Sequence, residues 1–228
     1  MVQYILTDIE GTTTSISFVH DVLFPYATAH LPSWVRAHRS EARVKAALAE
    51  VAATVLAEQG IATDEAEQIE WLLRWIKEDR KHSALKAIQG YLWKDGYEAG
   101  AYRSHVYEDV PVALERWKQQ GLKMGVYSSG SVPAQRLLFG YSELGDLQPY
   151  FSDYFDTAVG HKRSADSYRN IQKALGLPAN AILFLSDVAE ELDAAKEAGM
   201  QGLQLLRPGI VPSERHQGVS TFAEILPG

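Results

Sequence analysis

Four short apolar runs, separated by helical patterns, constrain the fold of this chain most strongly. They lie at residues 4–8, 122–128, 181–187 and 202–206. The runs are apolar on both faces, which is typical of parallel strands covered by helices on either side. Several of the amphipathic segments between them end in a glycine at or near the position of a helix C-cap. The alternation predicts an α/β fold with a doubly wound, mostly parallel sheet.

One long stretch breaks this alternation. Between residues 41 and 100, three amphipathic helical patterns follow one another with no strand between them. We therefore expect a helical insertion at 16–105, after the first strand, and a core formed by 1–15 and 106–228. The Pro- and Gly-rich segment at 207–218 predicts a surface loop before a short final helix.

Composition narrows the class of protein. The 228 residues are 46% hydrophobic and 22% charged, which suffices for a large core and an accessory unit. A net charge of −7 with dispersed basic residues argues against a nucleic-acid partner. The chain has no cysteine, which excludes thiolate metal sites and suits a reducing compartment. No apolar run approaches the roughly 20 residues that span a bilayer, so we expect a soluble, cytoplasmic protein without a membrane partner.

Two aspartates stand at strand ends. Asp8 ends the first apolar run and Asp187 ends the third. Ligands of open α/β sheets bind beyond the carboxyl ends of the strands, so neighbouring strands would bring these carboxylates together. Either residue alone fits equally well as a helix cap, but the pair favours an oxygen-only Mg²⁺ site. Glu191, one helical turn later, could face the metal, although we expect a solvated position for it.

Two further segments could bind an anion. Residues 127–131, YSSGS, join an apolar run to a helical pattern, so backbone N–H groups and the Ser128 hydroxyl could meet an anion. An ordinary serine cap of the helix is the simpler alternative. Lys162 follows a strand-like segment and could balance the charge of a phosphate and of Asp8. Taken alone, Lys162 would be read as a solvated surface lysine.

The order of these residues resembles that of the haloacid dehalogenase superfamily. Asp-x-Glu-Gly-Thr comes first, then a serine after the next apolar run, then a lysine, and then an aspartate after another apolar run. Response-regulator receivers use similar residues in another order and in shorter chains. The insertion at 16–105 matches the position of the superfamily's cap domain. The resemblance implies a Rossmann-type core with a helical cap after the first strand.

A closer resemblance is to the enolase-phosphatases of methionine salvage. Glu10 is the most informative residue, because most phosphatases of the superfamily have Asp there. The segment YSSGSxxAQ is nearly as specific, while the serine before Asp187 stands where threonine is about as common. The other matching segments are DIEGTTTSISFVHDVLFPYA, FDTAVGHKRSADSYRNI, ILFLSDV and RPG.

The resemblance assigns roles to these residues. Asp8 would be the nucleophile that forms an aspartyl phosphate, and Glu10 the acid and base for the leaving group and the water. Ser128 and Lys162 would hold the phosphoryl oxygens. Asp8, Asp187 and the backbone carbonyl of Glu10 would ligate Mg²⁺.

The resemblance also implies a substrate. It is a phosphorylated diketone, 2,3-diketo-5-methylthiopentyl-1-phosphate, which the family enolises and dephosphorylates to an acireductone. Ser129 is a candidate substrate contact, and no residue identifies itself as the enolisation base. Phe18, His20, Trp93 and Tyr97 could form an apolar wall for the methylthio group, although aromatic residues at helical spacing more often belong to a core. The family also implies a monomer.

Two alternatives stay open at this point. A generalist sugar-phosphate phosphatase or phosphomutase would keep the four motifs and lack only the enolase step. A non-catalytic binding module would keep the fold alone, and the intact set of motif residues argues against it. A dehalogenase is disfavoured, because hydrolysis of a carbon–halogen bond needs no metal and would leave Glu10 and Asp187 unexplained.

Overall fold

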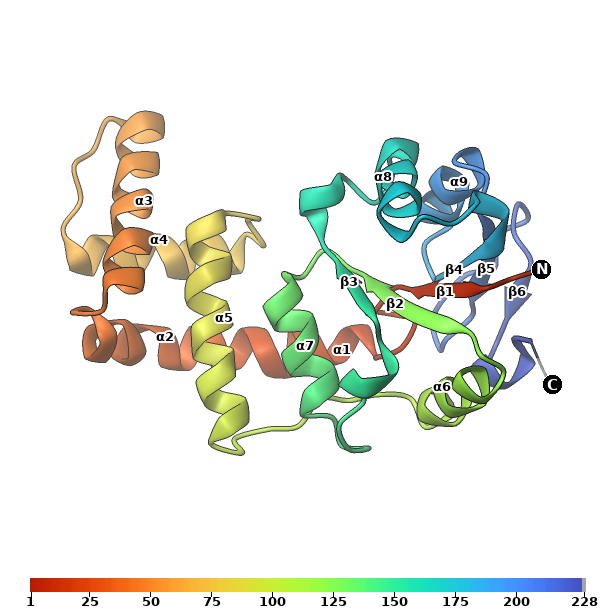
Figure 1. The fold of residues 1–228 in the computed structure, drawn as a ribbon. Helices are drawn as coiled ribbons and strands as arrows, with labels where there is room; N and C mark the ends of the chain where they lie inside the picture. The colour runs from red at the N-terminus through yellow and green to blue at the C-terminus, as the bar shows by residue number, and fades with distance from the viewer. Residues whose placement is uncertain (227–228) are drawn as a thin grey trace. The chain divides into compact units, whose positions relative to one another are not determined.

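The computed structural model describes residues 1–226 and divides the chain into two compact units (Figure 1). The larger unit comprises residues 1–18 and 103–228, and the smaller one comprises 19–102. The insertion therefore begins and ends a few residues inside the expected limits of 16 and 105. Within the described residues, no helix is long and apolar enough to cross a membrane.

The larger unit contains a six-stranded parallel sheet with the order β3-β2-β1-β4-β5-β6. This confirms the predicted α/β class. The four apolar runs all form strands, and the strand-like segment before Lys162 contributes β3. One shorter strand that the sequence did not indicate, β6, completes the sheet. The strands are β1 (Tyr4–Thr7), β2 (Lys123–Tyr127), β3 (Asp153–Phe155), β4 (Ile182–Ser186), β5 (Gln201–Leu205) and β6 (Gly218–Val219).

Helices cover the sheet because the central strands are apolar on both faces. Tyr4 and Leu6 of β1 pack in one buried cluster with residues of α8 and α9, which lie together on one side of the sheet in Figure 1. The helix α6 lies on the other side in Figure 1, and its Trp117 is fully buried. The helices of this unit are α1 (Ile16–Phe18), α6 (Asp109–Gln119), α7 (Val132–Gly140), α8 (Ala165–Leu175) and α9 (Ala189–Glu197). The tail after β5 is mostly loop and ends in a 3₁₀ turn at Phe222–Glu224.

The smaller unit is helical throughout its ordered elements. A π-helix (Val19–Leu23) precedes its helices, which are α2 (Phe24–His38), α3 (Ala42–Gln59), α4 (Glu65–Lys77) and α5 (Ser83–Glu98). Three of them match the predicted patterns, and α4 begins with a capping box between Asp64 and Glu67. The sequence did not indicate α2, which contains Pro32. Leu31 and Val35 of α2 are fully buried in the core of this unit, so packing outweighs the lost backbone hydrogen bond.

Candidate active site at the strand ends

Three of the expected site residues directly follow adjacent strands. Asp8 follows β1, Ser128 follows β2 and Asp187 follows β4, and β1 pairs with both of the other strands. The Asp8 backbone N–H donates to the Leu185 carbonyl at 2.9 Å, which continues the ladder to the last residue before the loops. The parallel register therefore carries all three side chains to the same edge of the sheet. This arrangement confirms that the strands bearing the two aspartates are neighbours.

Lys162 joins this group from the loop after β3. Its Nζ atom lies 2.6 Å from Asp8 Oδ1 and 2.7 Å from Glu191 Oε2. All three side chains are buried. The Lys162 carbonyl accepts a hydrogen bond of 2.7 Å from the Tyr168 hydroxyl, which ties this loop to α8. Lys162 is therefore no surface lysine, although its sequence context alone suggests one.

Glu191 was expected to be solvated, and that expectation is wrong. Its side chain is buried and bonds both Lys162 and the Ser186 hydroxyl, which donates at 3.0 Å. Glu191 lies in the first turn of α9, four residues after Asp187, so its side chain returns to the strand ends. The spacing of Glu191 from Asp187 already indicated that Glu191 could face the site. The sequence pattern of an exposed helical face favoured the wrong alternative.

Negative charge exceeds positive charge among these groups. Burial and the Asp8 carboxylate raise the pKa of Asp187 to about 7. The same two causes raise the pKa of Glu191 to about 6, against the opposing effect of Lys162. Burial lowers the pKa of Lys162, but the carboxylates of Asp8 and Glu191 outweigh burial and hold this pKa above the ordinary lysine value. A single ammonium thus faces three carboxylates, a setting that favours a divalent cation.

The loop after β1 is shaped around Asp187. Gly11 has a φ of +75°, and a Cβ atom at this position would collide with the Asp187 carboxylate. The Thr12 hydroxyl accepts a hydrogen bond of 3.1 Å from the Asp187 backbone N–H. The Asp187 Oδ1 atom is buried and has no hydrogen-bond partner among residues 1–226. This carboxylate oxygen is buried and unpaired, and the backbone of Gly11 approaches the carboxylate closely. Such an oxygen is suited to act as a Mg²⁺ ligand.

Glu10 lies on the same loop, one residue before Gly11, and is half-buried. Its backbone pairs with Thr14 in an isolated bridge, which closes the turn between β1 and α1. Among residues 1–226, no three His, Asp or Glu side chains are grouped to hold a metal ion. The metal ligands expected from the sequence are two carboxylates, Asp8 and Asp187, and the backbone carbonyl of Glu10. The roles of these residues stay predictions.

The serines of the loop after β2 have different roles in the structure. Ser131 is the N-cap of α7, because its hydroxyl accepts a hydrogen bond from the Ala134 N–H at 3.4 Å. Ser128 is therefore not the cap, and its hydroxyl instead accepts a hydrogen bond of 3.2 Å from the Gly130 N–H. Ser129 is exposed. Asp187 is not a cap either, since α9 starts after Val188 without a side-chain cap bond.

The aromatic candidates for an apolar wall divide into two groups. Phe18 and Tyr97 are buried, and Tyr97 packs edge-on against Tyr102. Trp93 is half-buried and donates from its indole N–H to the Leu23 carbonyl at 3.1 Å. His20 is exposed and lies edge-on to Phe24. Phe18 and Tyr97 are thus core residues, and the substrate-facing role of all four stays a prediction.

The fold and the strand-end carboxylates define a haloacid dehalogenase-like hydrolase. The family profile described in those words matches residues 2–199, which is most of the chain. Solved structures of more distant proteins share the fold alone, such as a haloacid dehalogenase phosphatase from Thermococcus onnurineus with a TM-score of 0.59 and 20% identity, over 98% of this chain and 95% of that one.

More similar proteins narrow the family. A protein of Pseudomonas aeruginosa named Enolase-phosphatase E1 is 54% identical over 99% of this chain and 98% of its own length. One of the same name from a Picosynechococcus species is 51% identical, with the same coverage. The crystal structure of the Unknown transcript 4 protein of Saccharomyces cerevisiae has a TM-score of 0.84 and 34% identity, over 99% of this chain and all of that one. The chain belongs to the enolase-phosphatase E1 family.

Proposed function

We propose that this enzyme converts 2,3-diketo-5-methylthiopentyl-1-phosphate to the acireductone 1,2-dihydroxy-3-keto-5-methylthiopentene and phosphate, as a Mg²⁺-dependent step of methionine salvage. The observation that carries the proposal is the buried contact of Lys162 with Asp8, beside Asp187 at the ends of adjacent strands. Relatives named Enolase-phosphatase E1, about half identical over nearly the whole chain, support the enolase step and the substrate.

In this proposal Asp8 is the nucleophile. One of its oxygens attacks phosphorus, the bond from phosphorus to the substrate oxygen breaks, and an aspartyl phosphate forms. The carboxyl group of Glu10 gives its proton to the leaving oxygen. Glu10 then removes a proton from a water molecule, which attacks phosphorus, releases phosphate and restores Asp8. Lys162 holds Asp8 in place at 2.6 Å and offsets the charge of the phosphoryl oxygens.

The remaining residues would bind and orient the reacting groups. Ser128 offers its hydroxyl proton to a phosphoryl oxygen, because its oxygen already accepts from Gly130. Ser129, which is exposed, would contact the diketone. Asp8, Asp187 and the Glu10 carbonyl would hold the Mg²⁺ ion. When bound, Mg²⁺ would supply Lewis-acid stabilisation of charge on the phosphoryl group and on an enolate.

The proposal also covers the role of the smaller unit, the location of the protein and its oligomeric state. Residues 19–102 would act as the cap domain of the enzyme. We further propose a cytoplasmic monomer. Light scattering at micromolar concentration tests the monomer, and a dimer mass would refute it.

One experiment separates this function from its alternatives. The purified enzyme is incubated with the diketone phosphate and Mg²⁺, and acireductone absorbance and phosphate release are followed together. We expect both products in equal amounts. Phosphate without acireductone would indicate a generalist phosphatase, and binding without either product would indicate a non-catalytic module.

A further inference from the structure

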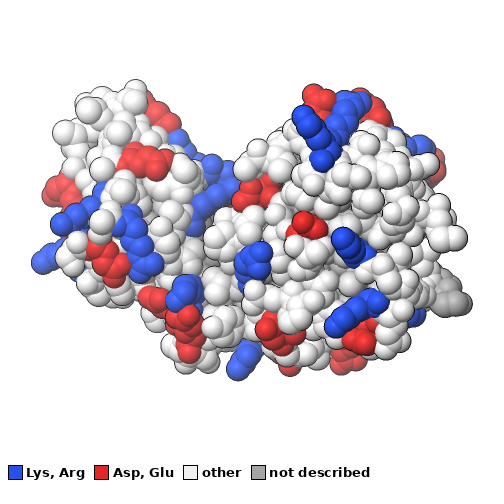
Figure 2. Space-filling model, in the orientation of Figure 1, with Lys and Arg blue, Asp and Glu red and all other residues white. Residues whose placement is uncertain are grey.

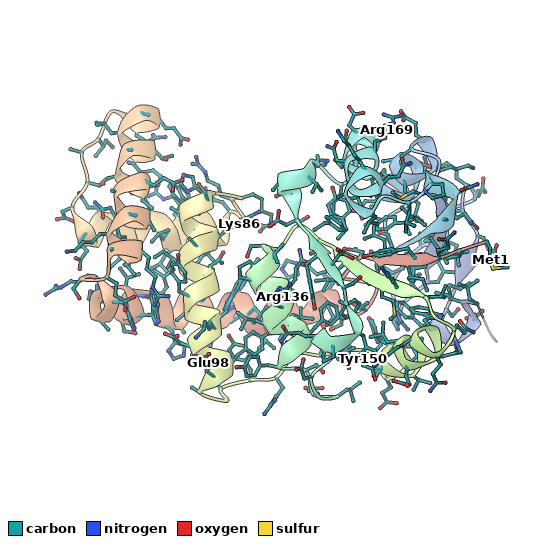
Figure 3. The ribbon with its side chains drawn as sticks, in the orientation of Figure 1. Met1, Lys86, Glu98, Arg136, Tyr150 and Arg169 are labelled. Atoms are coloured by element: carbon teal, nitrogen blue, oxygen red, sulfur yellow. The ribbon has the colours of Figure 1, made fainter. Side chains whose placement is uncertain are left out.

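Gln135 is a buried polar residue to which the proposed chemistry gives no role. It lies in the first turn of α7 and is 1% exposed. Its neighbour Arg136, labelled in Figure 3, is exposed and places its guanidinium 4.4 Å from the ring centre of Tyr154. The helix therefore turns Gln135 inward. The same residue ends the YSSGSxxAQ segment that the family resemblance singles out.

The side-chain amide of Gln135 ties the loop after β2 at two points. Its Nε2 atom donates to the Gly130 carbonyl at 2.8 Å and to the Phe155 carbonyl at 2.8 Å. The Phe155 carbonyl also accepts a hydrogen bond of 3.1 Å from the Ser128 N–H. Gln135 thus links the middle of the loop to the backbone oxygen that anchors its start.

These bonds fix the direction of the loop's donors. The Gly130–Ser131 peptide is trans, so its C=O and N–H groups point in opposite directions. Because Gln135 holds the Gly130 carbonyl on the buried side, the Ser131 N–H points away from that side. The Gly130 N–H in turn bonds the Ser128 oxygen, which leaves the Ser128 hydroxyl proton to donate elsewhere.

The primary amide of Gln135 makes both bonds from one nitrogen. A single nitrogen with two protons serves two carbonyls, which neither a carboxylate nor a thioether can do. The arrangement leaves the Gln135 Oε1 atom buried without a partner among residues 1–226. A buried acceptor without a partner destabilises the folded state, so stability alone does not account for glutamine here.

We propose that Gln135 is a positioning residue, which holds loop 128–131 in the conformation that presents Ser128 and Ser129 to the phosphoryl group. The identity of the substrate in this inference rests on the proposed function. The geometry of the loop does not depend on it. Gln135 itself touches neither substrate nor metal in this account. Its effect is exerted through the backbone of Gly130 and Ser128.

The test compares Gln135→Met, which keeps the side-chain length and loses both donors, with Gln135→Asn, which keeps the donors and loses reach. The matched control is Ser142→Ala, just beyond the other end of α7. Ser142 is 2% exposed, donates to the Gly145 carbonyl at 2.6 Å and accepts from the Leu144 N–H at 3.2 Å. It too is a buried polar side chain that fixes a turn, yet it lies outside loop 128–131.

We expect Gln135→Met to lower kcat/KM for the diketone phosphate about 10- to 100-fold, since a displaced binding loop misaligns the reacting groups. The Kd of inorganic phosphate with Mg²⁺, measured by calorimetry, should rise about 10-fold, as for the loss of one charged hydrogen bond. Gln135→Asn should show a smaller loss in both quantities. Ser142→Ala should change neither, even where its melting temperature falls as far as that of Gln135→Met.

Each outcome decides the inference. If kcat/KM and phosphate affinity, both expressed per folded protein, stay within about twofold of wild type in the two Gln135 variants, the positioning role is refuted. An equal loss of phosphate affinity in Ser142→Ala would also refute it, because the effect would then follow general destabilisation. If the wild-type enzyme does not turn over the diketone phosphate, the proposed substrate fails, while the phosphate titrations still test the loop.

Discussion

Replacing Lys162 by methionine should destabilise the protein strongly. The ammonium lies 2.6 Å from Asp8 and 2.7 Å from Glu191, and its side chain is 7% exposed. Methionine would leave both carboxylates buried without a counter-charge. Removing one partner of a buried ion pair typically costs about 3–5 kcal/mol. For a chain of 228 residues, about 2–4 °C per kcal/mol converts this to a fall in melting temperature of roughly 6–20 °C.

The assay is thermal unfolding, followed by circular dichroism at about pH 8 without added metal. At that pH the carboxylates of Glu191 and Asp187, with pKa values of about 6 and about 7, are ionised in the wild-type protein. The matched control is Lys94→Met. The Nζ atom of Lys94 lies 2.7 Å from Glu98 Oε1, but its side chain is 51% exposed. Glu98 is labelled in Figure 3.

Because an exposed ion pair contributes about 0–1 kcal/mol, Lys94→Met should lower the melting temperature by less than about 4 °C. Both variants replace a lysine by methionine, and the lysine–carboxylate distances are nearly the same. The two sites differ in how deeply the ion pair is buried. If Lys162→Met melted within about 2 °C of wild type, the buried cluster would not depend on Lys162 and the electrostatic reasoning would be refuted. A large and equal fall in both variants would also contradict the role of burial.

Three further changes test separate parts of the site. Glu10→Gln should lower turnover roughly 10²–10⁴-fold by removing the proton donor, and Glu10→Asp should lower it less, because it loses only reach; phosphate release at saturating substrate measures both. Chelation of Mg²⁺ should stop phosphate release, and Ca²⁺ should not restore it, because its looser and larger coordination misplaces the nucleophile; full rescue by Ca²⁺ would contradict the assigned metal. Gly11→Ala should displace the Asp187 carboxylate and weaken Mg²⁺ binding, which appears as a smaller Mg²⁺-induced rise in melting temperature; an unchanged rise would contradict the close approach.

The sequence predicted the strand-end residues well for a physical reason. Asp8, Ser128 and Asp187 each follow a continuous apolar run, and parallel strands bring such positions to one edge of the sheet. The sheet order then makes β1 a direct neighbour of both β2 and β4. A local pattern therefore determined most of the candidate site.

Residues that depend on non-local packing escaped prediction. Glu191 looks like one of several charged residues on an amphipathic helix, and its burial depends on its contacts with Lys162 and with the Ser186 hydroxyl. The helix α2 carries Pro32, a local signal against a helix, which burial of Leu31 and Val35 overrides. The strand β6 has only 2 residues, too few to show the alternation of a strand.

The distribution of surface charge gives less information about function than the strand-end residues do. Basic and acidic side chains are interspersed on the face shown in Figure 2. This agrees with the dispersed basic residues in the sequence, and the expectation of no nucleic-acid partner stays a prediction. Exposed ion pairs, such as Arg169 with Asp166 at 2.7 Å, contribute little to stability.

Trapping the covalent intermediate tests the central claim most directly. The wild-type enzyme is mixed with the diketone phosphate and Mg²⁺, quenched in acid during the first turnover, reduced with borohydride and digested for mass spectrometry. Reduction converts an aspartyl phosphate to homoserine. The account predicts homoserine at position 8 in the wild-type enzyme and none in Asp8→Asn, which should keep the fold and release no phosphate. Homoserine at another position, or phosphate release by Asp8→Asn at a substantial fraction of the wild-type rate, would contradict it.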